Sequence, residues 1–500
     1  MSPSEVLIFA LCFPVGMSFI IRGLGRWPNL REAVTLLTAG TLFYQVCGLV
    51  PHVMAGESIT VLLAAPAPGI EIRFDLEPLG MLFALIASGL WIITTIFAIG
   101  YMRGNDEKNQ SRFFMCFAIA IGAVMGIAFA GNMFTLFIFY EVLTLSTFPL
   151  VTHKGDAASR KSGRIYLGIL LSTSVLFLLL GTVWVYVLAG SVDFQAGGVM
   201  TGKIDPKLGL PLLALFVFGI GKAAVMPFHK WLPAAMVAPT PVSALLHAVA
   251  VVKAGVFSVL KVSIYLFGID FIRDSGAGEV LMWAAAATIL LASMVAMTKD
   301  NLKARLAYST ISQLSYIVLG AMIATAMSVK GSALHIAMHA VGKITLFFCA
   351  GAIYTKVHKT NISQLDGLGR KMPLTFAAFF IGSLSIIGLP PCGGSWSKWY
   401  LILGAADAGQ FMMIVVFMIS SLLNVAYLLP IPIRAFFRPA RDETSEQDPV
   451  GQEAARFRWD QVDEASFCCV FPPVVTALGC IVLFFSADTI MFLINRIPLS

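Results

Sequence analysis

Residues 221–255 read GKAAVMPFHKWLPAAMVAPTPVSALLHAVAVVKAG and hold a lysine near each end of an otherwise apolar stretch. Lys222 follows one apolar run and Lys253 lies inside another, so neither ammonium group reaches water at a helix end. A lysine inside a membrane costs at least about 2.5 to 3.5 kcal/mol, which favours a role for its charge. The prolines between the two lysines predict a helix that breaks beside Lys222.

The composition indicates a membrane protein. Of the 500 residues, 58% are hydrophobic and 12% are charged, and the mean hydropathy is +0.85. A soluble domain holds about 25% charged residues. Apolar runs near the roughly 20 residues that cross a bilayer predict an all-α polytopic membrane protein of about 14 transmembrane helices.

Basic residues fall mainly in alternate loops, which predicts the side of the membrane that each loop faces. This pattern places both chain termini on the non-cytoplasmic side of a cell membrane. The net charge of +7 is therefore mostly a topology signal, and no nucleic acid is expected as a partner. The first apolar run lacks a preceding basic segment, so we interpret it as a retained span and not as a cleaved signal.

The sequence holds none of the motifs that bind common cofactors. It has eight cysteines without a C-x-x-C pair, no dinucleotide fingerprint and no phosphate-binding loop. We expect neither a cofactor nor a metal site. Any redox chemistry would belong to a partner, and whether the protein counts as an enzyme stays open.

Glu141 is an acid deep inside an apolar span, MFTLFIFYEVLTLSTFPLV. A buried carboxylate needs a partner. We expect an ion pair between Glu141 and Lys222, because each is the isolated charge of its span. The alternative is a neutral Glu141 hydrogen-bonded to backbone or hydroxyl groups.

A later span stacks three ionisable side chains. His335, His339 and Lys343 recur every four residues, so they project from one face of a helix. The stack predicts a proton relay over roughly 12 Å. A metal site is disfavoured because no carboxylate or cysteine cluster accompanies the histidines.

Two further ionisable residues are possible relay groups. His247 lies six residues before Lys253, and Lys261 lies eight residues after it. His247 either passes a proton through water or is a buried neutral histidine hydrogen-bonded to backbone. Lys261 either relays or extends its ammonium group to the outer interface. Hydroxyl residues 309–315 of a neighbouring span line a wet path or bond to their own helix, and we favour the second interpretation.

A second interrupted helix is predicted at residues 388–394 (GLPPCGG), and Lys398 follows it. Two broken helices, each beside a lysine, indicate inverted repeats around the ion path of a transporter. The alternation of Ile70, Ile72 and Phe74 with charged residues predicts a short hairpin strand on the outer face. The predicted division is N-terminal scaffold helices at 1–110, two repeats (spans 4–8 and 9–13) at 111–266 and 279–430, a cytoplasmic loop at 431–466 and a last transmembrane helix at 467–500.

Several of these segments resemble one known family. The run KAAVMPFHKWLPAAMVAPTPVSALLHAVAVVKAGVF, together with FIFYEVLTLSTFPLVTHKG, NLKARLAYSTISQLSYIVLG and GLPPCGGSWSKW, resembles the antiporter-like subunits of respiratory complex I and of Mrp-type sodium/proton antiporters. The resemblance covers roughly residues 80 to 430 and is greatest to the D subunit of Mrp antiporters. It departs from the family pattern at Ala234, where the family usually has an aspartate.

The resemblance implies a proton-translocating subunit of a multisubunit monovalent cation/proton antiporter. The alternative is a proton-pumping subunit of an NADH:quinone oxidoreductase or of a membrane-bound hydrogenase, and a pure scaffold is disfavoured. The partners implied are other hydrophobic membrane subunits, protons, and sodium or potassium. The transport residues that it implies are Glu141, Lys222, Lys253, His335, His339, Lys343 and Lys398.

Overall fold

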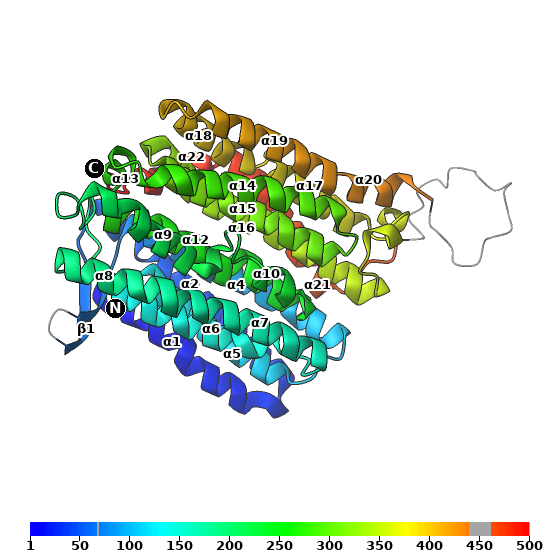
Figure 1. Cartoon of the computed structure of the whole chain (residues 1–500). Helices are drawn as coiled ribbons and strands as arrows, with labels where there is room; N and C mark the ends of the chain where they lie inside the picture. The colour runs from blue at the N-terminus through cyan, green and yellow to red at the C-terminus, as the bar shows by residue number, and fades with distance from the viewer. Residues whose placement is uncertain (68–69, 440–461, 500) are drawn as a thin grey trace.

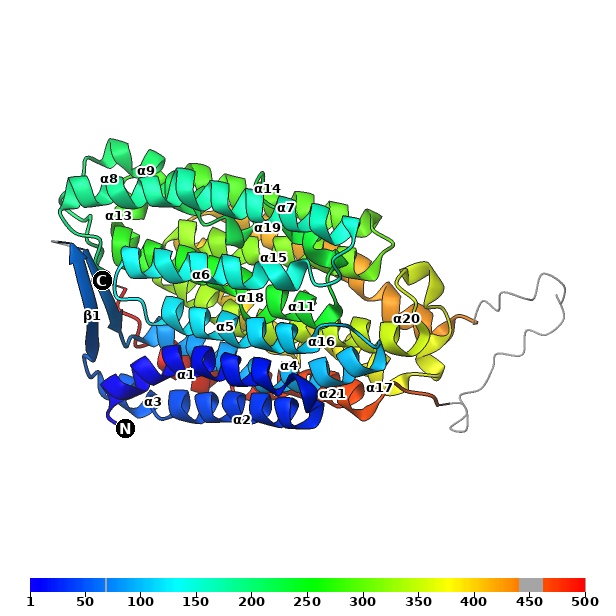
Figure 2. The same ribbon diagram turned by 90° about the horizontal axis from the view of Figure 1, so that it is seen from below.

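The computed structural model describes residues 1–67, 70–439 and 462–499. The chain forms a bundle of long helices whose axes run along one common direction, with a β-hairpin at one end (Figures 1 and 2). The helices have these bounds: α1 (Pro3–Gly23), α2 (Pro28–Cys47), α3 (Val50–Ala55), α4 (Pro78–Gly104), α5 (Gln110–Ala128), α6 (Met133–Val151), α7 (Ala157–Thr173), α8 (Leu180–Ala189), α9 (Gly209–Gly219), α10 (Trp231–Ala234), α11 (Thr240–Ala244), α12 (Val251–Lys261), α13 (Ile269–Asp274), α14 (Ala277–Thr298), α15 (Leu302–Ile323), α16 (Ala326–Val357), α17 (Pro373–Ile387), α18 (Gly394–Asp407), α19 (Phe411–Leu428), α20 (Pro430–Phe437), α21 (Phe467–Phe485) and α22 (Ala487–Ile494).

The predicted membrane architecture is confirmed. Twelve helices in the described ranges are long and apolar enough to cross a bilayer, and two shorter apolar helices accompany them. The shorter ones are Pro206–Gly219 and Pro373–Ile387. The chain is therefore a multi-pass membrane protein. Each shorter helix ends at one of the two predicted interruptions, so these two helices are shorter than a full span.

The helix starts follow from local capping. Glu77 accepts hydrogen bonds from the backbone N–H groups of Leu79 and Gly80 at the start of α4. Asn132, Asn301 and Thr325 accept in the same way at the starts of α6, α15 and α16. The first N–H groups of a helix lack an intrahelical partner, and a short polar side chain supplies one.

The first broken span is visible in the backbone. After α9 ends at Gly219, a single 3₁₀ turn at residues 221–223 carries Lys222. Short helical turns follow, including α10, and the next span begins only at Thr240. The second break separates Ile387, the last residue of α17, from Gly394, the first residue of α18. Gly388 has φ +89°, which an L side chain rarely adopts.

The predicted hairpin is also confirmed. Strands β1 (Thr60–Ala67) and β2 (Ile70–Asp75) pair antiparallel, with Val61 opposite Phe74. Both chain termini lie at the same end of the bundle as the hairpin (Figure 1). Which side of the membrane this end faces stays a prediction.

Helix α16 lies at the centre of the bundle. It is 32 residues long and packs against α15, α17, α18 and α21, and also against α4 and α12. Most of its side chains are buried, including His335, His339 and Lys343. It therefore joins the first interrupted half of the chain to the second.

One predicted boundary is wrong. Helix α20 continues to Phe437, so the loop predicted at 431–466 begins later than expected. Residues 440–461 of that loop lie outside the described residues. The assignment of 111–266 and 279–430 as inverted repeats stays a prediction, with one broken helix in each.

Candidate functional site

Lys222 lies fully buried in the turn where the first broken helix stops. Its Nζ donates to the carbonyl oxygen of Tyr140 at 2.8 Å and to Thr144 Oγ1 at 2.6 Å. The ammonium also lies 3.1 Å from the centre of the Tyr140 ring, a cation–π contact. Neutral groups of α6 therefore hold the charge.

The expected ion pair between Glu141 and Lys222 is wrong in this structure. The residues described here supply no hydrogen bond to either carboxylate oxygen of Glu141, although both oxygens are buried. The side chain as a whole is half-buried, on the face of α6 that also exposes Val142 and Leu145. No ion pair or hydrogen bond joins Glu141 to Lys222 among the described residues. The reason is the break, which directs the lysine toward Tyr140 and Thr144.

The most informative contact joins the two halves of the chain. Lys253 Nζ on α12 lies 2.6 Å from His339 Nδ1 on α16, and both side chains are buried. Either nitrogen is the donor in this hydrogen bond, depending on which group holds the proton. The second ring nitrogen of His339 has no partner among the described residues. Two proton-binding groups thus share one hydrogen bond inside the membrane.

His335, His339 and Lys343 lie on one helix, α16, as predicted. The two histidines and the lysine contact different partners. The rings of His335 and His339 stack with centres 5.6 Å apart. His335 Nδ1 hydrogen-bonds Ser397 Oγ at 2.8 Å, next to Lys398. Lys343 instead donates to Ser309 Oγ at 2.6 Å, away from the histidines.

Lys398 lies near the start of α18, and its ammonium group reaches back to the second break. Its Nζ donates to the carbonyl oxygen of Ile387 at 2.8 Å and to Ser421 Oγ at 3.1 Å. Ile387 ends α17, so its carbonyl is one that a helix leaves unpaired. The ring of Tyr316 lies between Lys398 and His335: its centre is 4.9 Å from Lys398 Nζ and 5.6 Å from the centre of the His335 ring.

His247 is fully buried against Phe347 of α16, with ring centres 4.6 Å apart. Both of its ring nitrogens lack a partner among the described residues. The alternative that we left open, a histidine hydrogen-bonded to backbone, is therefore not what the structure has. Its role as a relay stays a prediction.

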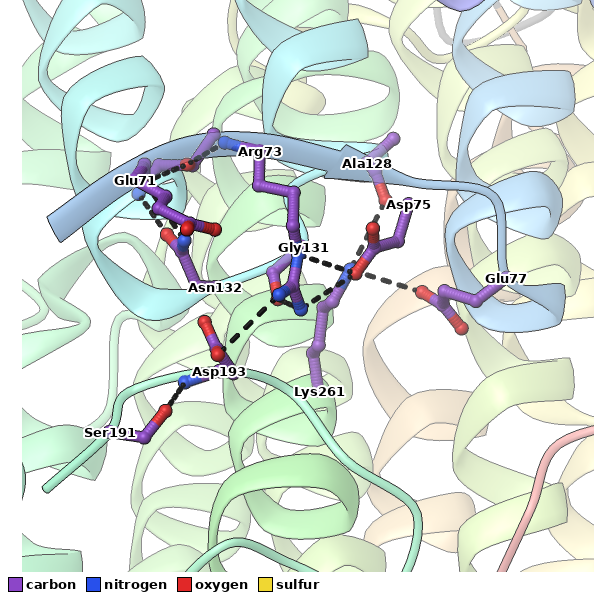
Figure 3. Close-up of polar contacts among 11 residues, drawn as sticks. Glu71, Arg73, Asp75, Glu77, Ala128, Gly131, Asn132, Ser191, Asp193 and Lys261 are labelled. Atoms are coloured by element: carbon purple, nitrogen blue, oxygen red, sulfur yellow. Dashed lines mark hydrogen bonds and ion pairs between the residues drawn. The ribbon is translucent and has the colours of Figure 1, made fainter. Parts of the chain in front are cut away.

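Lys261 lies apart from this group, beneath the hairpin (Figure 3). It is 1% exposed, and its Nζ lies 3.1 Å from Glu77 Oε1 and 3.4 Å from the carbonyl oxygen of Ala128. The Glu77 carboxylate also accepts a hydrogen bond from the Tyr265 hydroxyl at 2.6 Å. Lys261 therefore does not extend to the outer interface, and a relay role for it stays a prediction.

A polar cluster under the hairpin lies beside that pair (Figure 3). Arg73 of β2 bonds Asp75 at 3.1 Å, approaches Asp193 at 3.4 Å and donates to the carbonyl oxygen of Gly131 at 3.1 Å. These contacts join the hairpin to the start of α6 and to the loop after α8. The cluster ties together the hairpin end of the first half of the bundle.

Unpartnered polar atoms mark where water would be needed. Buried atoms without a hydrogen-bond partner in the described ranges belong to Glu141, Ser243, His247, Ser258, Gln313, His335, His339 and Asn424, among others. A buried polar group without a partner costs about 1–3 kcal/mol, and ordered water is the usual remedy. Most of these residues lie in the spans that carry the lysines and histidines.

Lys222 and Lys253 are brought together by backbone packing and not by a direct contact. Gly255 of α12 lies against the turn that carries Lys222, and a Cβ there would be 2.7 Å from the Lys222 carbonyl oxygen and would collide with the nitrogen of Ala223. No hydrogen bond that the described residues form joins the two ammonium groups. A proton moving between them would need water.

We expect Gly255→Ala to displace the Lys222 turn. Forcing a methyl group into packed backbone costs about 1–3 kcal/mol, and the displaced turn would also reduce the proton transport that the sequence predicts. The matched control is Gly168→Ala, because a Cβ at Gly168 of α7 meets open space. Thermal unfolding of the purified protein and proton uptake into everted vesicles measure both effects. An unchanged unfolding temperature for Gly255→Ala would contradict the close approach.

Several neutral partners were missed by sequence reasoning. Tyr140, Thr144, Tyr316, Ser397 and Ser421 all contact or flank the buried lysines and histidines. Tyr140 and Thr144 flank Glu141 in sequence, which was a usable signal. Among the hydroxyl residues 309–315, Thr310 and Ser315 bond to their own helix as favoured, whereas Ser309 contacts Lys343.

The family described as NADH:quinone oxidoreductase/Mrp antiporter, TM matches residues 130–424. The chain is 31% identical over 466 residues to NADH-quinone oxidoreductase subunit N of Desulforudis audaxviator (strain MP104C), with 91% of this chain and 89% of that protein aligned. It is 30% identical to Hydrogenase-4 component B of Escherichia coli (strain K12), of which it spans 58%, with 77% of this chain aligned.

The fold also matches a solved structure. A chain of the Mrp complex from Dietzia sp. DQ12-45-1b superposes with a TM-score of 0.86 at 23% identity, over 100% of this chain and 97% of that one. At this identity the likeness concerns the fold. The likeness covers nearly the full length of both chains.

Proposed function

Since the chain belongs to the NADH:quinone oxidoreductase/Mrp antiporter family of transmembrane proteins, we propose that it is a proton-translocating subunit of a multisubunit membrane complex. The observation that carries the proposal is the hydrogen bond of 2.6 Å between Lys253 and His339. Both groups gain and lose protons, and they connect the two halves of the bundle. A contact that only holds two helices together would need no group that gains and loses protons.

The proposed route runs laterally along the midplane of the membrane. It begins at Lys222, with Glu141 beside it, passes Lys253, His339 and His335, and ends at Lys398. Lys343 connects the route through Ser309 to Tyr427, whose hydroxyl lies 2.9 Å from Ser309 Oγ. The unpartnered polar atoms supply places for water between these groups.

The energy for transport must come from outside this chain. Moving one charge against the membrane potential costs about 2.3 kcal/mol per 100 mV. In a redox-driven complex, electron transfer in partner subunits would supply this energy. In an antiporter, a cation gradient would do so.

Between these two, we favour a subunit of an NADH:quinone oxidoreductase-type complex, the alternative that we held second from the sequence. The support is the alignment with subunit N, which spans 91% of this chain at 31% identity. A subunit of an Mrp-type cation/proton antiporter is the second candidate, because this chain superposes over its full length on a chain of an Mrp complex. In that case this chain would be the D subunit of the antiporter, as the sequence resemblance implies.

Purification with partner identification tests the proposal. We expect the tagged protein, extracted in mild detergent, to retain other hydrophobic membrane subunits. Co-purification of iron–sulfur and quinone-site subunits supports the redox-driven complex, whereas a set of hydrophobic antiporter subunits alone supports the antiporter. A single chain that transports protons in liposomes without partners would contradict both.

A further inference from the structure

A basic cavity lies at the end of the bundle opposite the hairpin, away from the transport residues. It has a volume of about 790 Å³ and lies between the end of α1 and the start of α5. Its lining holds four arginines and one acid, with Trp27 at its side: Arg22, Arg26, Arg31, Arg112 and Glu107. Nothing in the proposed function uses these residues.

One of the arginines is built into the fold. Arg31 is 3% exposed, and it donates to Ser111 Oγ at 3.1 Å, Gln110 Oε1 at 2.9 Å and Glu32 Oε1 at 3.1 Å. Its Nε is buried and has no partner among the described residues. Glu32 also pairs with Arg103, so one carboxylate is shared by two guanidinium groups. The floor of the cavity therefore keeps an excess of positive charge.

The other arginines have N–H groups that donate no hydrogen bond within the described residues. Arg22 and Arg26 are four residues apart and exposed, and no hydrogen bond or ion pair holds either one within the described ranges. Arg112 donates one NH2 bond to the carbonyl oxygen of His153, and its buried Nε has no described partner. Guanidinium groups with free N–H donors match the geometry of phosphate oxygens.

The surroundings of the cavity are those of a membrane interface. Trp27 is 61% exposed and Leu30 is 51% exposed beside it. On the preceding turns of α1, Phe19 is 69% exposed and Ile20 is 50% exposed. Tryptophan is typical of the headgroup level, and exposed apolar side chains on a spanning helix face acyl chains. The arginines thus lie directly above a lipid-facing surface.

We propose that this cavity binds the phosphate headgroup of an anionic phospholipid such as phosphatidylglycerol. Arg22 and Arg26 donate to the phosphodiester oxygens, and Arg31 and Arg112 add positive charge from below. The acyl chains lie along Phe19 and Ile20. A soluble phosphate ion would use the arginines alone and would gain nothing from these apolar side chains.

Lipid binding by the purified, delipidated full chain, with any partners that remain bound, tests the proposal. The test variant is Arg22→Gln/Arg26→Gln. The matched control is Lys161→Gln/Arg164→Gln, two exposed basic residues near the start of α7 outside the cavity. Native mass spectrometry with phosphatidylglycerol and with phosphatidylcholine of the same acyl chains measures the affinity.

We expect the test variant to bind phosphatidylglycerol about 25-fold more weakly, about fivefold for each arginine, and the control to bind as the parent does. If the double variant unfolds, Arg26→Gln alone keeps the test valid, with the fivefold loss expected. Equal binding by parent and variant would overturn the proposal. So would displacement of the lipid by inorganic phosphate at millimolar concentration, which would indicate a soluble anion. Loss of a partner subunit with unchanged lipid binding would assign the cavity to a protein interface and overturn it as well.

Discussion

Replacing Lys222 with methionine abolishes proton transport and leaves the protein folded. Lys222 is the buried ammonium of the first break, held by Tyr140 and Thr144. Without it, the proposed route lacks the lysine that would pass a proton on to Lys253. The substitution removes the cost of burying an ammonium group that no carboxylate pairs with, so stability should not fall.

The measurement combines proton uptake into everted vesicles with thermal unfolding of the purified protein. Lys230→Met is the matched control, because Lys230 is an exposed lysine of the same interrupted segment. We expect the control to transport normally. Normal transport by Lys222→Met would remove Lys222 from the route, whereas loss of both transport and stability would indicate a structural role.

Lys398→Arg should stop transport although it keeps the charge. A lysine in a desolvated site exchanges its proton, whereas a guanidinium group holds its proton throughout the physiological range. If Lys398 is the last group of the route, a proton that cannot leave blocks every turnover. A charge that serves only to attract or orient neighbours would tolerate arginine.

Space around Lys398 is limited, since a Cβ at Gly388 would lie 2.7 Å from Lys398 Cδ. The arginine variant therefore needs an unfolding curve beside its transport assay. Lys371→Arg is the control, because Lys371 is exposed near the start of α17. Wild-type transport by a folded Lys398→Arg would make Lys398 a fixed electrostatic element and end the route elsewhere. Lys398→Met should fail in either case.

The bundle and its two breaks could be predicted because their signals are local. The length of an apolar run shows whether it can cross a bilayer. Clustered prolines or glycines show where a helix is interrupted. The two short helices, Pro206–Gly219 and Pro373–Ile387, end where the sequence predicts. The spacing of His335, His339 and Lys343 likewise places them on one face of α16.

The partners of the lysines could not be predicted, because they depend on packing between distant helices. Charge alone favours Glu141 as the partner of Lys222, but the break turns the ammonium group toward Tyr140 and Thr144. Glu77 was missed as the partner of Lys261, since its position follows from the hairpin and from the start of α4. The spacing of residues along one helix does not tell which atom of another helix each side chain contacts.

The acceptors for Lys222 and Lys398 include main-chain oxygens, those of Tyr140 and Ile387. Every amino acid carries such an oxygen, so no substitution at residue 140 or 387 deletes it. A mutational scan would therefore score Ile387 as a site of side-chain size alone, although its carbonyl stabilises a buried charge. Replacing the peptide group by an ester at residue 388, which weakens the carbonyl of Ile387 as an acceptor, would make that contribution visible to experiment.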